Sequence, residues 1–414
     1  MAVEVGIFLV GAIIFIGFFS LYFFERTKVP DVILLMLLGV FLTSGLHVLD
    51  GKVFASLAPF FGALALIVIL FDSGLNLKMT QVLGELSKVT AFSLAVFALT
   101  VALIGAGMHL FFGWDILWGL LLGTALGGTA AAIIWPIVSK LPVREETKTL
   151  LALESILTSP LCVVTALALM QVILAQSVDF SRVSGDIVAA FSTAGMAGII
   201  AGLLWLGILK HFHGKNFGYM LTLGAVFILY GVTTFLKGNG AIAALVFGLI
   251  IGNAPVFAKA LKLGDNFDME ESIRHFQKEI SFFVRTFFFV YLGIIFSPEA
   301  LSVTVATMAG AVLVGIILAR YLVVKVYERV DARFERYQTL LVGMMPRGLA
   351  AAVLASLPLA SGVQIPSFAE IVFIIIVLTN VIATVAAFVF EREAPRPVTA
   401  FKAGPHVVTQ RTAR

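Results

Sequence analysis

Long apolar stretches, separated by short polar connections, dominate the pattern of the chain. About thirteen such stretches follow one another over the 414 residues, and each is close to the ~20 residues that an α-helix needs to cross a bilayer. The pattern therefore predicts an all-α polytopic membrane protein in which little of the chain is left for a soluble domain. The predicted helices cover residues 4–24, 31–48, 54–71, 89–112, 114–138, 149–175, 185–209, 217–236, 240–257, 279–297, 300–326, 337–360 and 368–390.

Composition and charge support this class and add an orientation. The chain is 60% hydrophobic and 13% charged, against roughly 25% charged in soluble domains. Most of its 28 Lys and Arg residues fall in alternate loops and in the C-terminal tail, whereas Lys52, Arg182 and Lys237 fall in the other loops. Because cytoplasmic loops carry the excess of basic residues, we expect a multi-pass protein of the cell (plasma or inner) membrane with its N-terminus outside and its C-terminus in the cytoplasm.

Two of the stretches contain residues that weaken a helix in mid-membrane. The fifth holds Gly127, Gly128 and Pro136, and the twelfth holds Gly343 and Pro346. Gly and Pro are also common in ordinary membrane helices. However, interrupted segments at matching positions of two halves are typical of inverted-repeat transporters. The pair therefore favours two crossed, broken helices.

The sixth stretch carries a single acid, Glu154, followed by the hydroxyl residues Ser155, Thr158 and Ser159. An ionisable residue at bilayer depth is costly and indicates an ion or proton pathway. Hydroxyl oxygens can bind a hard cation, but a serine does not titrate near neutral pH. The alternative is that these hydroxyls only bond back to the carbonyl one turn earlier.

Four further segments, taken in order and spacing, resemble a known family. They are Lys28–Gly39, Leu70–Leu77, Gly240–Asn253 and Phe288–Gly293. The chain resembles, nearly end to end, the NhaP-type members of the monovalent cation/proton antiporter superfamily, which are related to the eukaryotic sodium/proton exchangers. The resemblance implies thirteen spans in inverted repeats, an NhaA/NhaP-like fold with spans 5 and 12 crossed and broken, and a homodimer. It also implies an ion site where the fifth span meets the sixth.

The chain departs from that family at the ion site itself. In the sixth span the family has Glu-Ser-x-x-Asn-Asp-Pro, whereas Thr158 and Ser159 replace the Asn-Asp pair here. In the fifth span the family has Thr-Asp-Pro, whereas Ala130 follows Thr129 here. The family's sixth-span Asp carries the cation or proton, so the resemblance does not say which group does so in this chain.

The resemblance also gives Glu154 a partner, because the family pairs this acid with an arginine that matches Arg320. Two roles for Glu154 stay open, a structural ion pair and direct handling of the ion. We expect Arg347, in the broken twelfth span, to compensate helix ends or to pair with an acid. Asp72 ends the third span and either draws cations into a cytoplasmic funnel or is a solvated helix cap. Arg285 is expected to reach the cytoplasmic surface as a snorkelling side chain.

The leading interpretation is a secondary active transporter that exchanges Na⁺ or K⁺ for protons by alternating access. Two alternatives remain, a transporter of the same fold with altered substrate or coupling, and a membrane sensor or partner that transports nothing. No nucleophile–base pair, phosphate loop or metal cluster points to an enzyme, and no cofactor, nucleic acid or metal beyond the transported cation is expected. The predicted ion-binding residues are Thr129, Glu154, Ser155, Thr158 and Ser159.

The expected organisation is one transmembrane domain, residues 1–390, followed by a basic cytoplasmic tail, residues 391–414. A core is expected mainly in residues 89–175 and 300–390. A dimerisation part is expected mainly in residues 4–71 and 217–297. Membrane lipids and a second copy of the chain are the expected partners.

Overall fold

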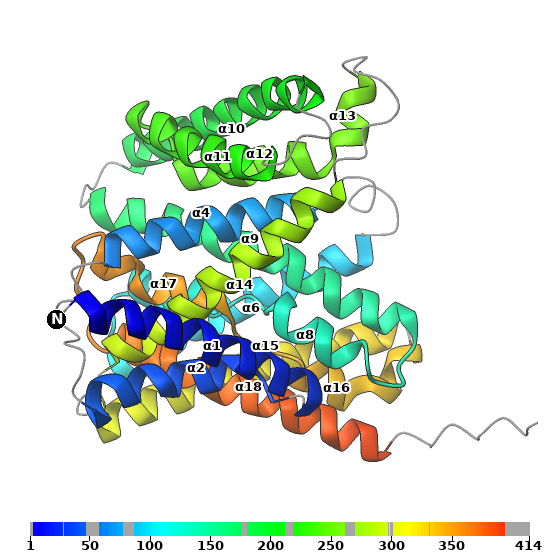
Figure 1. Cartoon of the computed structure of the whole chain (residues 1–414). Coiled ribbons are helices and arrows are strands. Elements are labelled where there is room, and N and C mark those ends of the chain that lie inside the picture. The colour runs from blue at the N-terminus through cyan, green and yellow to red at the C-terminus, as the bar shows by residue number, and fades with distance from the viewer. Residues whose placement is uncertain are drawn as a thin grey trace, which may run out of the picture.

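The structure is a computed structural model, and the part of the chain that it describes forms a single bundle of helices without strands (Figure 1). The described residues are 3–27, 29–46, 58–77, 87–175, 180–211, 218–260, 270–296, 298, 301–330 and 332–393. The predicted tail lies outside them from residue 394 onward. The helices are α1 (Val3–Thr27), α2 (Asp31–Val40) with the π-helical turn η1 (Phe41–Gly45), α4 (Ala58–Asn76), α6 (Ser87–Phe112), α7 (Ile116–Ala125), α8 (Ala131–Val138), α9 (Glu145–Ala175), α10 (Phe180–His211), α11 (Gly218–Phe235), α12 (Gly240–Gly252), α13 (Ala254–Ala260), α14 (Glu270–Ile295), α15 (Val303–Val330), the 3₁₀ turn η3 (Ala332–Tyr337), α16 (Gln338–Gly343), α17 (Leu349–Ala360) and α18 (Phe368–Glu393).

Each predicted apolar stretch overlaps one of these helices or a pair of them. Among the described residues, seven helices are long and apolar enough to cross a membrane, and five apolar segments are shorter. The prediction of an all-helical membrane protein is confirmed. The count of thirteen crossings stays a prediction.

The fifth and twelfth stretches are broken helices, as their Gly and Pro residues predicted. Residues 126–130 separate α7 from α8, and residues 344–348 separate α16 from α17. The two breaks meet, because the backbone N–H of Ala130 donates to the carbonyl of Pro346 at 3.0 Å. Each break thus satisfies a backbone group that the other helix leaves open, which irregular backbone at membrane depth requires.

Glycines let α2 and α14 approach closely. A Cβ atom on Gly39 would lie 2.1 Å from the carbonyl oxygen of Val290, and one on Gly293 would lie 2.2 Å from that of Met36. No real side chain tolerates such distances, so these positions require glycine. The backbones of α2 and α14 are therefore in direct contact at these two positions.

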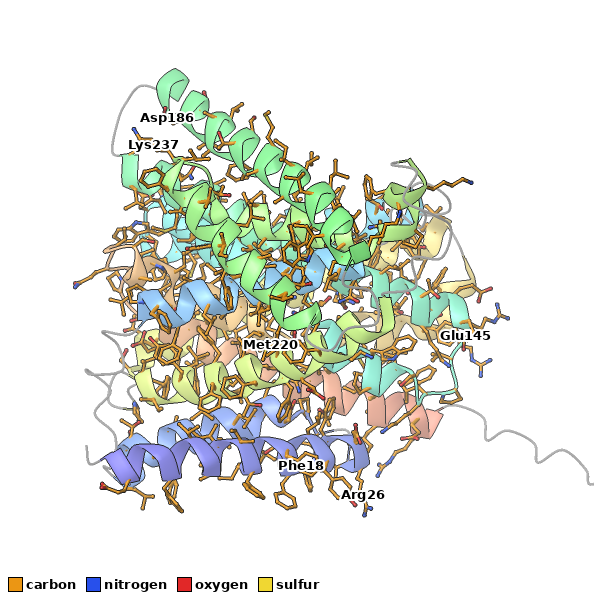
Figure 2. The ribbon with its side chains drawn as sticks, turned by 45° about the horizontal axis from the view of Figure 1, so that its top comes forward. Phe18, Arg26, Glu145, Asp186, Met220 and Lys237 are labelled. Carbon is orange, nitrogen blue, oxygen red and sulfur yellow. The ribbon has the colours of Figure 1, made fainter. Side chains whose placement is uncertain are left out.

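Arg26 and Lys237, which the sequence assigned to opposite sides, lie at opposite ends of the bundle. Figure 2 shows Lys237 and Asp186 at one end and Arg26 and Glu145 at the other. Lys52 lies outside the described residues, and so does the side chain of Arg182. In Figure 1, α1 starts at one end of the bundle and α18 finishes at the other.

Candidate functional site

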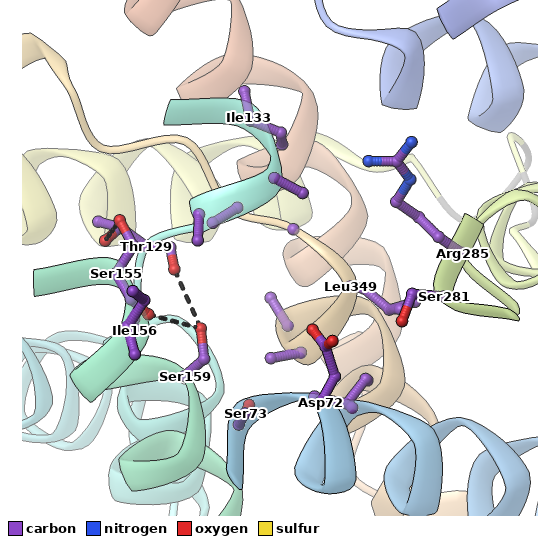
Figure 3. Close-up of a pocket in the computed structure, with 18 of the residues that line it drawn as sticks. Asp72, Ser73, Thr129, Ile133, Ser155, Ile156, Ser159, Ser281, Arg285 and Leu349 are labelled. Carbon is purple, nitrogen blue, oxygen red and sulfur yellow. Dashed lines mark hydrogen bonds between the residues drawn. The ribbon is translucent and has the colours of Figure 1, made fainter. Parts of the chain in front are cut away.

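Four of the five predicted ion-binding residues form one cluster of hydroxyl groups where the fifth-span break meets α9. The Thr129 hydroxyl donates to the Ser155 Oγ at 3.1 Å, and the backbone N–H of Thr129 donates to the Thr158 Oγ1 at 3.2 Å. The Ser159 hydroxyl donates to the Thr129 carbonyl at 3.2 Å. Figure 3 shows Thr129, Ser155 and Ser159 together on one side of a cavity.

The three α9 hydroxyls also bond back along their own helix, as the alternative interpretation expected. Ser155 donates to the Leu151 carbonyl at 2.8 Å, Thr158 to the Glu154 carbonyl at 2.9 Å, and Ser159 to the Ser155 carbonyl at 2.9 Å. A hydroxyl whose proton is held by a carbonyl offers only its oxygen lone pairs to a ligand. The cluster is therefore a set of neutral oxygen acceptors, which suits a cation and not an anion.

Glu154 points elsewhere and forms a buried ion pair with Arg320. Two guanidinium nitrogens contact its two carboxylate oxygens at 2.5 and 2.9 Å, and the side chains are 0% and 1% exposed. The remaining Nε of Arg320 donates to the carbonyl of Leu341, in the last turn of α16. This two-pronged geometry is the strong form of an arginine–carboxylate contact, and it ties α9, α15 and α16 together.

Arg347 joins the two broken spans. Its guanidinium Nη1 donates to the carbonyl of Gly128 just beyond α7, and its backbone is held by Thr379 at 3.2 Å and Asn380 at 2.8 Å. Carbonyl ends of helices carry partial negative charge and open acceptors. Arg347 stabilises that end of α7, and Arg320 does the same for α16.

A cavity of about 680 Å³ lies beside the hydroxyl cluster. One side, here called the hydroxyl wall, presents Thr129, Ser155 and Ser159. The opposite side, here called the charged wall, is formed by α4 and α14 and presents Asp72, Lys278 and Arg285. In Figure 3, Ser281 lies between Asp72 and Arg285, and Ser73 lies on the side of Asp72 nearer to Ser159. Glu154 does not line the cavity. Among the described residues, the carboxylate that lines the cavity is that of Asp72.

The charged wall corrects one expectation, because Arg285 does not snorkel. Its side chain is 13% exposed, and its Nη2 lies 3.0 Å from the Oδ2 of Asp31, which is 0% exposed. Sequence reasoning did not single out Asp31, which follows Pro30 at the start of an apolar stretch and resembles an ordinary helix-start residue there. An acid at that position combined with an arginine inside another span was the available signal.

The fold and site together define a class: a helical membrane transporter built around two crossed, broken spans with an oxygen cluster beside a cavity. Residues 11–391 match the model of the family described as sodium/hydrogen exchanger, transmembrane. The chain belongs to this family, which is a family of transporters and not of enzymes.

The relatives that match are distant in sequence, and their names agree with this family. The chain is 23% identical to the K(+)/H(+) antiporter NhaP of Alkalimonas amylolytica, over 61% of this chain and 45% of that protein. It is 27% identical to the Na(+)/H(+) antiporter 1 of Methanocaldococcus jannaschii, over 65% of this chain and 63% of that protein. It is 24% identical to the sodium/hydrogen exchanger 8 of Arabidopsis thaliana, over 70% of this chain and 40% of that protein. The matches thus span less than two thirds of the length of these relatives.

The fold also matches a solved structure over nearly its whole length. The sodium proton antiporter MjNhaP1 from Methanocaldococcus jannaschii superposes with a TM-score of 0.77 at 20% identity, over 95% of this chain and 99% of that one. The antiporter fold that the resemblance implied is therefore confirmed.

Proposed function

We propose that the protein is a secondary active transporter that exchanges a monovalent cation, Na⁺ or K⁺, for protons. The observation that carries the proposal is the cluster of neutral oxygens at the crossing of two broken spans, open to a cavity. Relatives named as Na(+)/H(+) and K(+)/H(+) antiporters give both candidate cations.

The cation is proposed to bind between the two walls of the cavity. Thr129, Ser155 and Ser159 supply oxygens from the hydroxyl wall, and Asp72 supplies negative charge from the charged wall. Thr158 acts indirectly, because its oxygen accepts the Thr129 N–H and so holds the broken backbone in place. A hard monovalent cation is suited to such a set of oxygen ligands.

Asp72 is proposed to take up the exchanged proton. Serine hydroxyls cannot titrate near neutral pH. Glu154 is an acid, but a proton there would leave Arg320 as a buried unpaired charge, and breaking such a pair costs about 3–5 kcal/mol. A proton and a cation that exclude one another at Asp72 would give exchange, while Glu154 and Arg320 hold the helices around the site.

The transport cycle is proposed to start from a state open to the cytoplasm. The cavity is lined by Leu21 near the end of α1, Asn76 at the end of α4 and Lys278 near the start of α14, at the bundle end that the basic residues mark as cytoplasmic. At the opposite end, the rings of Phe296 and Phe373 stack with centroids 3.9 Å apart. Alternating access would open that stack as the core, residues 89–175 and 300–390, moves against residues 4–71 and 217–297.

A homodimer in the cell membrane, with the N-terminus outside, completes the proposal. The dimer is assigned to residues 4–71 and 217–297 by the resemblance. Its support in the structure is the exposed apolar face of α1, where Phe15 and Phe18 are 68% and 59% exposed. Lipid covers such a face as well as a second copy does, so cross-linking in membranes is the measurement that decides.

The exchange is tested in proteoliposomes that carry a preformed pH difference and a pH-sensitive dye. Addition of Na⁺ or K⁺ should dissipate the difference, Asp72→Asn should abolish the response, and Glu145→Gln, which removes an 81% exposed acid, should retain it. Cation flux without proton movement would favour a transporter with altered coupling. Absence of flux for every cation would favour a sensor or partner that transports nothing.

A further inference from the structure

The ion pair between Arg285 and Asp31 occupies an unusual place, because only one of its members lines the cavity. Arg285 is part of the charged wall, whereas Asp31 lies behind it on α2 and does not reach the cavity. The wall that faces the proposed cation therefore carries a guanidinium whose counter-charge is hidden from the ion.

The pair is also loosely held. It has one contact, from Nη2 to Oδ2, and among the described residues neither carboxylate oxygen of Asp31 nor the Nε of Arg285 makes a hydrogen bond. The pair of Glu154 and Arg320 differs in its hydrogen bonds, since both carboxylate oxygens of Glu154 and the Nε of Arg320 are bonded. Charge attraction thus holds Arg285 in place without the geometric restraint of a two-pronged contact.

The two helices that carry the loose pair are in close contact farther along their length. Gly39 and Gly293 bring the backbones of α2 and α14 together eight residues beyond Asp31 and Arg285, and the Arg285 side chain is the part that we expect to rearrange. An arginine has a long stem with several rotatable bonds. In Figure 3 the side chain of Arg285 points away from Asp72, although both line the same cavity.

We propose that Arg285 is a tethered cation that competes with the transported ion for the negative charge of Asp72, and that Asp31 sets the affinity by holding Arg285 away. The proposal rests on the proposed cation exchange and adds an affinity-determining pair to it. Asp31 and Arg285 act through Asp72 and are positioning residues. Lys278, the other positive group of the charged wall, lacks a buried acid behind it among the described residues and repels the ion independently.

Four variants, two single and two double, separate the tethered charge from a merely structural pair. Asp31→Asn frees Arg285 and should raise the apparent KM for Na⁺ or K⁺ about tenfold, since close like charges interact strongly at low dielectric. Arg285→Gln removes the competitor and leaves the negative charge of Asp31 without its partner, so it should lower KM. The double variant Asp31→Asn/Arg285→Gln should return KM to about the wild-type value. The double variant Asp31→Asn/Arg285→Lys keeps the charge and should keep KM raised.

Binding to the purified protein supplies a second readout, measured as thermal stabilisation by NaCl or KCl against choline chloride. The cation concentration that gives half of the full stabilisation should follow the same order as KM. It should be highest for Asp31→Asn, lowest for Arg285→Gln and near the wild-type value for the neutral double variant. Glu145→Gln is the matched control and should leave both readouts unchanged. If Asp31→Asn does not fold, Arg285→Gln against Arg285→Lys decides, because only the loss of charge should lower KM.

The outcomes distinguish the two proposals. If the wild-type protein exchanges ions but Asp31→Asn leaves KM unchanged, the tethered-cation proposal is overturned and the exchange stands. The same conclusion follows if Asp31→Asn/Arg285→Gln keeps the raised KM of Asp31→Asn. If the variants bind the cation in the expected order but the wild-type protein moves no protons, the exchange is overturned and the tethered-cation proposal stands. Protein without flux and without binding overturns both.

Discussion

The two walls of the cavity handle charge in opposite ways. Behind the hydroxyl wall, Glu154 and Arg320 satisfy one another completely, so the wall presents only neutral oxygens to the cavity. The charged wall presents Asp72 and Arg285 directly, and the partner of Arg285 lies behind it in a contact with unused hydrogen-bonding capacity. An ion pair whose hydrogen bonds are all formed holds its helices together. An ion pair with unused hydrogen-bonding groups leaves charge available to respond to an ion.

The largest expected effect comes from breaking the ion pair between Glu154 and Arg320. Arg320→Gln leaves Glu154 buried without its partner and should lower the free energy of unfolding by about 3–5 kcal/mol. Thermal unfolding in detergent measures this. The double variant Glu154→Gln/Arg320→Gln should recover most of the loss, because two neutral groups no longer require one another.

The corresponding single and double variants of Asp31 and Arg285, at the charged wall, sharpen the comparison. The coupling free energy between Asp31 and Arg285, from a double-mutant cycle of unfolding, should be about 1 kcal/mol. A coupling free energy as large as that between Glu154 and Arg320 would mean that both pairs hold their helices together equally well, and the contrast between the walls would not hold.

A carboxylate moved from one wall to the other tests where exchange takes place. Asp72→Asn should lose proton-coupled flux, and Ser159→Asp in the same protein should restore it in part. The reason is that Ser159 faces the same cavity and already contacts the Thr129 carbonyl. The measurement is cation-triggered relief of a pH difference in proteoliposomes. Restoration by Thr158→Asp instead would place the site deeper, because Thr158 does not line the cavity.

Sequence reasoning described the hydroxyl wall more fully than the charged wall, of which it named Asp72 and Arg285 but not Asp31, and the reason is physical. The members of the hydroxyl wall lie at helical spacing on α9, and Gly127, Gly128 and Pro346 mark the breaks that bring Thr129 to them, so a local pattern carries the information. The partnership of Glu154 with Arg320 came from a family resemblance, and the contact is present.

The charged wall has no such local pattern. Asp31 and Arg285 meet where α2 and α14, two helices far apart in sequence, pack closely together, as their contact at Gly39 and Gly293 also shows. Each residue taken separately has an ordinary explanation, a helix start for the acid and snorkelling for the arginine. A cavity between α4, α8, α9 and α14 likewise depends on packing that no single stretch of sequence specifies.

The smallest expected effect separates exposed charge from buried charge on the charged wall. Lys278 lines the cavity but is exposed, so its repulsion of a cation is weakened by solvent and by salt. Lys278→Gln should therefore lower the KM for Na⁺ or K⁺ about twofold at low ionic strength, and the effect should vanish at high ionic strength set with choline chloride. Arg285→Gln should keep its effect there, because Arg285 is mostly buried. Equal salt dependence in both variants would show that Arg285 acts through the bulk potential of the cavity and not through a local competition for Asp72.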